Sequence, residues 1–321
     1  MNELTSASQA SLIIIESVPL ERNPAAVYLA SLSESGRRTQ QQALNAIAEI
    51  LTGGHADAFT CNWGNVRYQH TAAIRTRLSE TYAPATANKM LSGLRRVLKD
   101  AWKLGYLTAE DYHRAVSVEN VKGSTLPSGR ELSAGEIAAL MHTCENDPSP
   151  AGPRDAAIIA LMYVGGLRRA EVVTLDVEDY DPEKGRLLVR GKRRKERTAY
   201  LVSGAKRAMA DWLAIRGDEP GSLFWPINKG GKMTNRKMTT QAIYNLLEKR
   251  AGQSGVKEFS PHDLRRTFVS DLLDAGADIA TVAKMAGHAS VQTTARYDRR
   301  PEEAKQKAAG LLHVPYRERI V

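Results

Sequence analysis

Cysteine is scarce in this chain of 321 residues, which contains only Cys61 and Cys144. Two isolated cysteines cannot build a disulfide framework or a four-ligand zinc site, and such scarcity is typical of the reducing cytosol. Long hydrophobic runs are also missing. The run SLIII near the N-terminus follows no basic segment and is far shorter than the ~20 residues that span a bilayer. The sequence therefore predicts a cytoplasmic protein without a membrane partner.

Positive charge, by contrast, is in excess. The chain has 45 Lys and Arg against 36 Asp and Glu, a net charge of +9, while 42% of its residues are hydrophobic. The hydrophobic fraction can build folded cores, and the length suits two domains of ordinary size. An excess of cations favours a polyanionic partner, although solubility alone explains it in some basic proteins.

The first part of the chain has helical periodicity. We interpret residues 1–22 as a tail and residues 23–112 as a helical domain. Its clearest helix lies in TANKMLSGLRRVLKDAWKLG, where one apolar stripe consists of Leu91, Leu94, Leu98 and Trp102. The opposite face is basic and consists of Lys89, Arg96, Lys99 and Lys103. This face lacks interleaved Glu, which favours DNA binding, but a merely solvated face stays an open alternative.

A second domain follows a linker rich in Gly, Ser and Pro. We place the linker at residues 113–131, because apolar spacing is lost in NVKGSTLPSGRE. Ser133 and Glu136 have capping-box spacing and mark the next helix. Further along, VEDY, RLLVR and RTAYLV predict a small antiparallel meander of three strands, and helical patterns resume after it. The predicted fold is mainly α, with an α+β second domain.

Several segments of this second domain carry polar groups at helical spacing. In SPHDLRRTF, Ser260 suits an N-cap and Pro261 the first helical position, which puts His262 and Arg265 on one helix face. A histidine and arginine at this spacing are more often structural than functional.

In GGLRRAEV, Arg168 and Glu171 lie one turn apart at a helix start. Arg168 and Arg265 could together clamp a phosphate group through bidentate hydrogen bonds.

The hairpin GRLLVRGKRRKER is unusually basic. Its seven cations, against the single Glu196, are Arg186, Arg190, Lys192, Arg193, Arg194, Lys195 and Arg197. Such a hairpin tip suits a phosphate backbone, and a nucleic-acid-binding hairpin without a catalytic role would have the same composition.

Taken in order, GLRRAEV, GKRRKER, HDLRRTF and GHASVQTTARY resemble the motif set of the tyrosine recombinases, the phage-integrase and Xer-like family. The resemblance is specific over residues 132–300, which it identifies as a catalytic domain. It is looser over residues 23–112, for which it implies a helical, SAM-like core-binding domain. For residues 301–321 it implies a C-terminal helix and tail that contact a neighbouring protomer.

The resemblance also implies a set of catalytic residues without a metal or other cofactor. These are Arg168, Lys192, His262, Arg265, His288 and Tyr297. Tyr297 is implied as the nucleophile, Lys192 as the general acid, and His262 as the base-like partner of the tyrosine. The two arginines and His288 are implied to stabilise the phosphate, and Glu171 is expected to orient the arginine side.

The expected partner is double-stranded DNA with short inverted core sites, located in the nucleoid. The resemblance implies that a tetramer binds this DNA and cleaves and rejoins its strands through a 3′-phosphotyrosyl intermediate. The residues expected to contact DNA are Lys89, Arg96, Lys99, Lys103, Arg193, Arg194 and Lys195. The short N-terminal tail predicts a core-site enzyme without an arm-binding domain. A type IB topoisomerase-like enzyme and a catalytically silent DNA-binding regulator are the alternatives.

Two other groups of residues compete with this interpretation. The acidic cluster LDVEDYD contains Asp176, Glu178, Asp179 and Asp181 and could suggest a two-metal nuclease. In a strand, however, its carboxylates would alternate between faces, which favours a solvated strand and turn. Tyr316 could be mistaken for the nucleophile, but no histidine precedes it at the required spacing, and packing of the tail explains it better.

Overall fold

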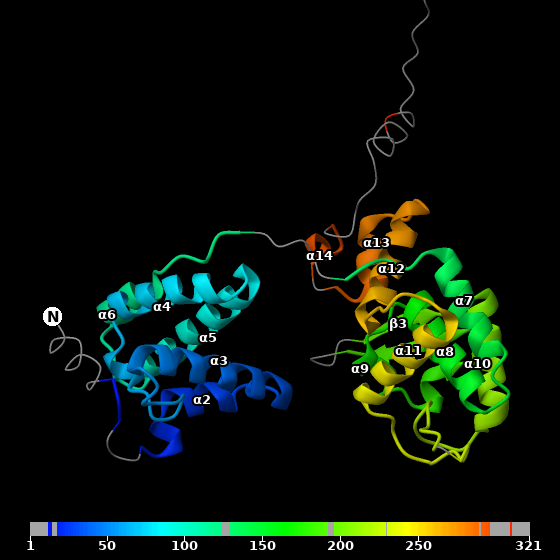
Figure 1. Cartoon of the computed structure of the whole chain (residues 1–321), viewed down its shortest axis with the longest axis horizontal. Coiled ribbons are helices and arrows are strands. Elements are labelled where there is room, and N and C mark those ends of the chain that lie inside the picture. Colours follow the sequence, from blue (N-terminus) through cyan, green and yellow to red (C-terminus); the bar gives the residue numbers. More distant parts are fainter. Residues whose placement is uncertain are drawn as a thin grey trace, which may run out of the picture. The chain divides into compact units, whose positions relative to one another are not determined.

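The chain folds into two compact units, residues 1–128 and 129–321. The computed structural model describes residues 12–14, 18–123, 129–191, 196–228, 230–288, 290–295 and 309. Within this described part, no helix has both the length and the apolar character needed to cross a membrane. Figure 1 shows that each unit is built mainly of helices.

The first unit is helical and has its own core. Its elements are η1 (Leu20–Arg22), α2 (Pro24–Ala30), α3 (Glu34–Thr52), η2 (Trp63–Asn65), α4 (Tyr68–Thr81), α5 (Pro84–Lys103) and α6 (Ala109–Val116). Helix α5 is the central helix and packs against α2, α3, α4 and α6. Leu91, Leu94 and Leu98 are buried, as the sequence pattern predicts. Helix α6 ends at Val116, inside the range predicted as linker.

The second unit combines nine helices of the described chain with one small sheet. Its helices are α7 (Ala134–Glu145), α8 (Ala151–Val164), α9 (Arg169–Val172), η3 (Val177–Asp179), α10 (Ser203–Arg216), α11 (Thr240–Ser254), α12 (Pro261–Asp274), α13 (Ile279–Ala286) and α14 (Val291–Ala295). Helix α8 is almost entirely apolar and packs against α7, α10 and α12. A helix that is apolar on all sides belongs in the interior, so α8 forms the centre of this core.

The sheet has three antiparallel strands in the order β1-β2-β3. Its strands are β1 (Tyr180–Asp181), β2 (Arg186–Arg190) and β3 (Glu196–Tyr200). Tyr180, Leu187 and Ala199 lie opposite one another in the register and are all buried. One sheet face therefore joins the core. The mainly α fold with one small three-stranded antiparallel sheet confirms the predicted fold class.

The prediction of a strand over VEDY is largely wrong. Residues Val177–Asp179 form the 3₁₀ helix η3, and only Tyr180 and Asp181 form β1. The Asp176 amide donates a hydrogen bond to Oδ2 of Asp179 at 3.0 Å. Aspartate side chains that bond nearby backbone amides favour such turns over strands. The carboxylates of this segment therefore do not follow the predicted strand alternation.

Candidate functional site

Helix α12 carries His262 and Arg265 in its first turns. Ser260 is the N-cap and Pro261 occupies the first helical position, as the sequence predicts, and Asp263 completes a reciprocal capping box with Ser260. The side chain of His262 is exposed, whereas Arg265 is only 2% exposed. The Arg265 guanidinium donates hydrogen bonds to the backbone carbonyls of Gly166 and Ala286. Arg265 therefore joins α12 to two other segments of the unit.

Gly166 is needed for this arrangement. Its φ is +57°, and a Cβ atom there would lie 2.5 Å from the ring of Phe268. Any other residue would have to adopt a left-handed backbone and displace a buried ring of α12. The close approach of the Gly166 backbone to α12 puts its carbonyl within reach of Arg265.

Arg168 is the N-cap residue of α9 and is paired with Glu171. One Glu171 oxygen accepts from Arg168 Nη1 at 2.8 Å, and the other accepts from the Arg168 amide at 2.9 Å. Glu171 is buried, while the Arg168 side chain is 43% exposed. Burial alone would raise the pKa of Glu171, but hydrogen bonds from Arg197 and Arg168 outweigh it and lower the pKa. The carboxylate is thus held ionised beneath a solvent-accessible arginine.

Three arginines from different elements bind the C-terminal end of α13. The Met285 carbonyl accepts from Arg197 Nε at 2.9 Å, and the Gly287 carbonyl accepts from Arg168 Nη2 at 3.3 Å. The Ala286 carbonyl between them accepts from Arg265. The last carbonyls of a helix have no partners within the helix and carry partial negative charge, which favours cations there. These contacts fix the segment that leads into His288.

His288 follows this helix end directly. Its amide donates to the Ala283 carbonyl, and its Nδ1 lies 2.8 Å from Oγ1 of the buried Thr294 on α14. Burial and the nearby charges of Arg265 and Arg168 lower the pKa of His288 to about 4. The pKa of His262 is also lowered, first by partial desolvation, although its side chain reaches solvent, and then by Arg265. Both imidazoles are therefore neutral at pH 7.

The structure thus gathers Arg168, Glu171, His262, Arg265 and His288 into one region, although α9, α12 and the end of α13 are far apart in sequence. Five other predicted site residues lie outside the described residues, so their geometry stays a prediction. They are Lys192, Arg193, Arg194, Lys195 and Tyr297. The alternative tyrosine, Tyr316, also lies outside the described part.

A short strap, residues 129–132, runs along α12 and anchors it. The Arg130 amide donates to Asp263 Oδ1 at 3.1 Å, and the Leu132 amide donates to Thr267 Oγ1 at 2.9 Å. Oε1 of Glu131 accepts from the hydroxyl of Ser270, one turn further along α12. Asp263, Thr267 and Ser270 recur at i, i+4 and i+7 and so share one helix face.

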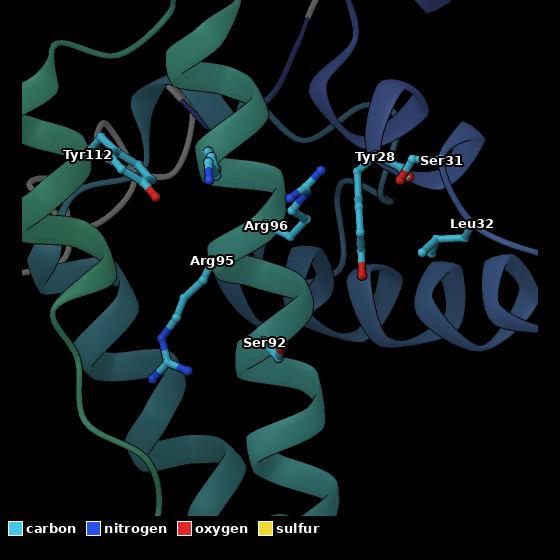
Figure 2. Close-up of a pocket in the computed structure, with 8 residues that line it drawn as sticks. Tyr28, Ser31, Leu32, Ser92, Arg95, Arg96 and Tyr112 are labelled. Atoms are coloured by element: carbon cyan, nitrogen blue, oxygen red, sulfur yellow. Dashed lines mark hydrogen bonds between the residues drawn. The ribbon is translucent and has the colours of Figure 1, made fainter. Parts of the chain in front are cut away.

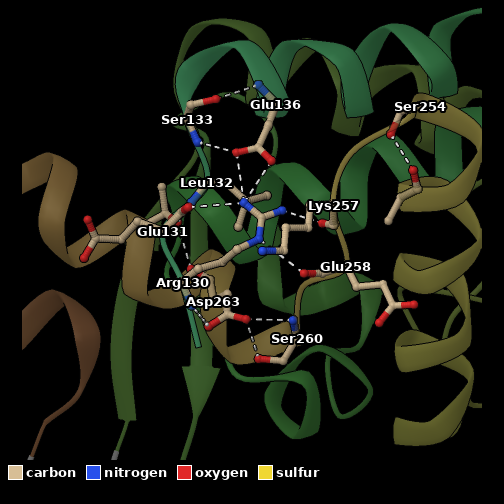
Figure 3. Close-up of polar contacts among 12 residues, drawn as sticks. Arg130, Glu131, Leu132, Ser133, Glu136, Ser254, Lys257, Glu258, Ser260 and Asp263 are labelled. Carbon is tan, nitrogen blue, oxygen red and sulfur yellow. Dashed lines mark hydrogen bonds and ion pairs between the residues drawn. The ribbon is translucent and has the colours of Figure 1, made fainter. Parts of the chain in front are cut away.

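Arg130 fastens the strap to two further segments. Its guanidinium pairs with Glu136 on α7 at 2.8 Å and donates to the carbonyls of Lys257 and Glu258 before α12 (Figure 3). Figure 3 also shows Asp263 between the strap and Ser260, whose amide and hydroxyl both donate to Asp263 Oδ2. Contacts among the strap, α7 and the segment before α12 therefore hold the N-terminus of the helix that carries His262 and Arg265.

In the first unit, the predicted basic face of α5 reaches solvent. Lys89, Arg96 and Lys103 are exposed and Lys99 is half-buried. Arg96 and Lys99 line a pocket together with residues of α2 and α6 (Figure 2). Arg96 is also 3.6 Å from the buried Asp100, so it is not a purely solvated cation.

Arg95 lines the same pocket but is bound within the unit. It donates to the Val118 carbonyl at 2.6 Å and to Asn120 Oδ1 at 3.0 Å, which ties α5 to the segment after α6.

The described hairpin arginines do not all extend into solvent. Arg190 pairs with the buried Asp179 at 2.5 Å, which uses one carboxylate of the acidic cluster. Within the described residues, no group of three or more His, Cys, Asp or Glu is arranged to hold a metal ion. Arg197 lies against Glu171 rather than at the solvent, with its Nη2 at 3.0 Å from Oε2.

Sequence reasoning missed Arg197 and Thr294 as parts of this region. For Arg197 a signal was available, because residues 197, 199 and 201 alternate along a strand and the last two are the apolar Ala199 and Leu201. The other cations of the segment made that alternation difficult to recognise in the sequence. For Thr294 no local signal exists, because its role depends on how α14 folds back toward His288.

Comparison with known proteins agrees with this geometry. The sequence profile of the phage integrase family matches residues 130–303, which is more than half of the chain. Tyrosine recombinase XerC of Corynebacterium efficiens is 30% identical over 282 residues, covering 80% of this chain and 87% of the relative. Tyrosine recombinase XerD of Lacticaseibacillus casei is 30% identical over 277 residues, covering 83% and 88%.

Solved structures share the fold at low identity. The Tn1549 transposon integrase in complex with a circular intermediate DNA has a TM-score of 0.66 and 15% identity, with 91% of this chain and 99% of the other covered. The XerH site-specific recombinase in a post-cleavage complex with difH has a TM-score of 0.63 and 18% identity, with 96% and 93% covered. At this identity the likeness shows a common fold.

The chain belongs to the phage integrase family, the tyrosine recombinases. Within that class it is a tyrosine site-specific recombinase with Xer-type relatives, as its motifs predicted. These relatives give no support to a topoisomerase-like enzyme or to a catalytically silent regulator.

Proposed function

We propose that this recombinase cleaves and rejoins double-stranded DNA through a covalent 3′-phosphotyrosyl intermediate at Tyr297. The observation that carries the proposal is the convergence of Arg168 and Arg265 on the end of α13, immediately before His288. Two fixed guanidinium groups beside a neutral imidazole suit a phosphate group whose negative charge increases during the reaction.

In the proposed reaction, Tyr297 Oη attacks the phosphorus, the P–O5′ bond breaks, and the phosphate becomes esterified to the tyrosine. The attacking hydroxyl loses a proton, and a tyrosine with the ordinary pKa near 10 is ionised at pH 7 only at a cost of about 4 kcal/mol. His262, neutral because its pKa is lowered, is able to accept that proton. Lys192 protonates the leaving 5′ oxygen. Attack of the 5′-hydroxyl on the phosphotyrosine reverses these steps.

His288 has a supporting role in this proposal. If the Thr294 hydroxyl donates to Nδ1, the imidazole proton is on Nε2, which can then donate to a non-bridging phosphate oxygen. Arg168 and Arg265 stabilise the same oxygens, and Glu171 holds Arg168 in place. Removal of one such donor costs on the order of 10²- to 10³-fold in rate.

We further propose that the helical unit binds one part of a core site through Lys89, Arg96, Lys99 and Lys103, while Arg193, Arg194 and Lys195 contact the backbone from the hairpin. The XerH and Tn1549 integrase structures were solved with DNA, which supports this partner. Residues 23–112 would then be a core-binding domain, residues 132–300 the catalytic domain, and residues 301–321 a contact between protomers of a tetramer. Such a protein acts in the cytoplasm, at the nucleoid.

The test incubates the protein and its Tyr297→Phe variant with nicked suicide duplexes drawn from DNA that flanks its gene. A nick next to the cleavage position lets the 5′-hydroxyl fragment diffuse away, so that the covalent adduct accumulates and is seen on a denaturing gel. We expect an adduct with the native protein and none with Tyr297→Phe. An adduct of equal yield in the variant would show that another residue is the nucleophile.

A further inference from the structure

We propose that Arg197 of β3 is a positioning residue that holds both Arg168 and the end of α13 in their working places. The inference rests on the proposed function, since it assigns Arg197 to the support of the same site. It differs from the expectation for a basic hairpin, in which Arg197 would be one of seven cations that face a phosphate backbone.

The Arg197 guanidinium spans two acceptors from two distant segments. Nη2 donates to Glu171 Oε2 at 3.0 Å, and Nε donates to the Met285 carbonyl at 2.9 Å. Its side chain is 12% exposed, whereas that of the neighbouring hairpin arginine Arg190 is 53% exposed. Because its Nη2 and Nε donors already bind acceptors within the protein and little of its surface is exposed, Arg197 is poorly placed to bind DNA.

The register of the sheet explains why Arg197 faces inward. It lies opposite the fully buried Val189 on β2 and two residues before the buried Ala199 on its own strand. Because side chains alternate between the faces of a strand, residues 197 and 199 share the covered face. A long cation on this face needs acceptors inside the protein, and Glu171 and the Met285 carbonyl supply them.

Glu171 connects Arg197 to the partly exposed Arg168. The same carboxylate binds Arg197 through Oε2 and Arg168 through both oxygens. Without Arg197, Oε2 of the buried carboxylate would keep only the Arg168 amide as its donor, and the carboxylate could turn away from the Arg168 guanidinium. The planar fork of an arginine fixes such a carboxylate in a way that a flexible ammonium group does not.

The second acceptor connects Arg197 to His288. Gly287, which separates His288 from α13, has a φ of +63°, and a Cβ there would lie 3.1 Å from Arg197 Cδ. The end of α13 therefore lies close to the aliphatic part of the Arg197 side chain and also contacts its guanidinium group. Loss of Arg197 would remove one of the three arginine contacts at this helix end.

The first experiment measures hydrogen–deuterium exchange of the full chain for the native protein, Arg197→Gln, Arg197→Lys and Arg207→Gln. Arg207 is an exposed arginine of α10 and serves as the matched control. In Arg197→Gln we expect amides in residues 168–173 and 284–288 to exchange at least about fivefold faster, as for local opening, with no change in α8. Unchanged exchange in those two segments, or an equal rise throughout the unit, would overturn the proposal.

The second experiment measures binding and single-turnover cleavage on a suicide duplex on which the native protein forms its adduct. For Arg197→Gln we expect an unchanged dissociation constant and cleavage about 10²-fold slower, the loss that a displacement of about 1 Å can cause. Arg197→Lys should recover only part of the rate. Weaker binding with normal cleavage of the bound DNA, or full recovery with lysine, would overturn the positioning role.

The two experiments separate failure of this inference from failure of the proposed function. If the native protein forms no adduct on any flanking duplex, the proposed function fails. The exchange measurement then still decides whether Arg197 holds the two segments together.

Discussion

At the residue scale, the two histidines of the site differ from ordinary surface histidines in their protonation. Burial and the surrounding arginines lower the pKa of His288 to about 4, against an ordinary value of 6.5. A neutral imidazole near Arg265 and Arg168 is a donor or acceptor of hydrogen bonds and adds no charge that would repel the arginines. This state also affects stability, because the folded protein resists a proton that the unfolded chain accepts below pH 6.5.

We therefore expect His288 to stay neutral down to about pH 5. Its folded-state pKa is depressed, so its contribution to stability is complete above pH 6.5 and is lost as the pH falls toward 4. A titration of imidazole signals by nuclear magnetic resonance, assigned with His288→Asn, measures this directly. Titration of the His288 signal near pH 6.5 would contradict the arrangement of charges around it.

The sequence identified Arg168, Glu171, His262, Arg265 and His288 by motif, and the structure brings these five into one region. It did not distinguish Arg197 from its neighbours, because a run of cations gives the same charge pattern whether one of them turns inward or not. The packing of β3 on the core determines that difference, through the buried partners Val189 and Ala199.

At the scale of elements, helix α12 depends on the strap of residues 129–132. The strap crosses the face formed by Asp263, Thr267 and Ser270. Gly129 begins the strap with a φ of +98°, and a Cβ there would lie 2.2 Å from Asp263 Oδ1. A side chain at this position would strain the backbone and disturb the carboxylate that caps α12.

Gly129→Ala is expected to destabilise the second unit by about 1–3 kcal/mol, because alanine at a positive φ is strained and displaces Asp263. Thermal unfolding measures the loss, and faster hydrogen exchange at residues 260–267 should accompany it. Gly135→Ala is the matched control, since a Cβ there would meet only Ser133 Oγ at 3.9 Å. A loss of the same size in both variants would contradict a specific role for the strap.

Local signals predicted the elements that have caps or strong periodicity. The capping box at Ser133 and the N-cap at Ser260 are present as predicted. The strand over VEDY failed because Asp176 and Asp179 form side-chain bonds that favour a 3₁₀ turn. Tertiary contacts of the strap with α12 join residues more than 130 positions apart, and no local pattern indicates them.

At the scale of the whole molecule, the net charge of +9 favours a polyanionic partner such as the proposed DNA. The residues of the basic face of α5 reach solvent, and their contact with DNA is a prediction from the composition of that face. Each cation that neutralises a phosphate releases counterions, so affinity depends on salt with a slope of about −0.9 per contact.

A variant with Lys89→Gln, Lys99→Gln and Lys103→Gln should bind duplex DNA more weakly, with a salt slope shallower by up to about 3. Fluorescence anisotropy with one duplex at increasing KCl concentrations measures the slope. Arg77→Gln serves as control, because Arg77 is exposed, belongs to α4 rather than α5, and pairs with Glu80. An unchanged slope in the triple variant would exclude α5 as a phosphate-binding surface.

The sequence by itself determined the class of this protein. Its ordered motifs identified the family, and its periodicities predicted a mainly α fold, because capping, helical spacing and charge are local properties of the chain. Only the tertiary structure decided that three arginines from α9, β3 and α12 meet the last carbonyls of α13. That arrangement arises from packing around a common core. Packing brings together residues that are far apart in the sequence, and no local sequence pattern indicates that they are close in space.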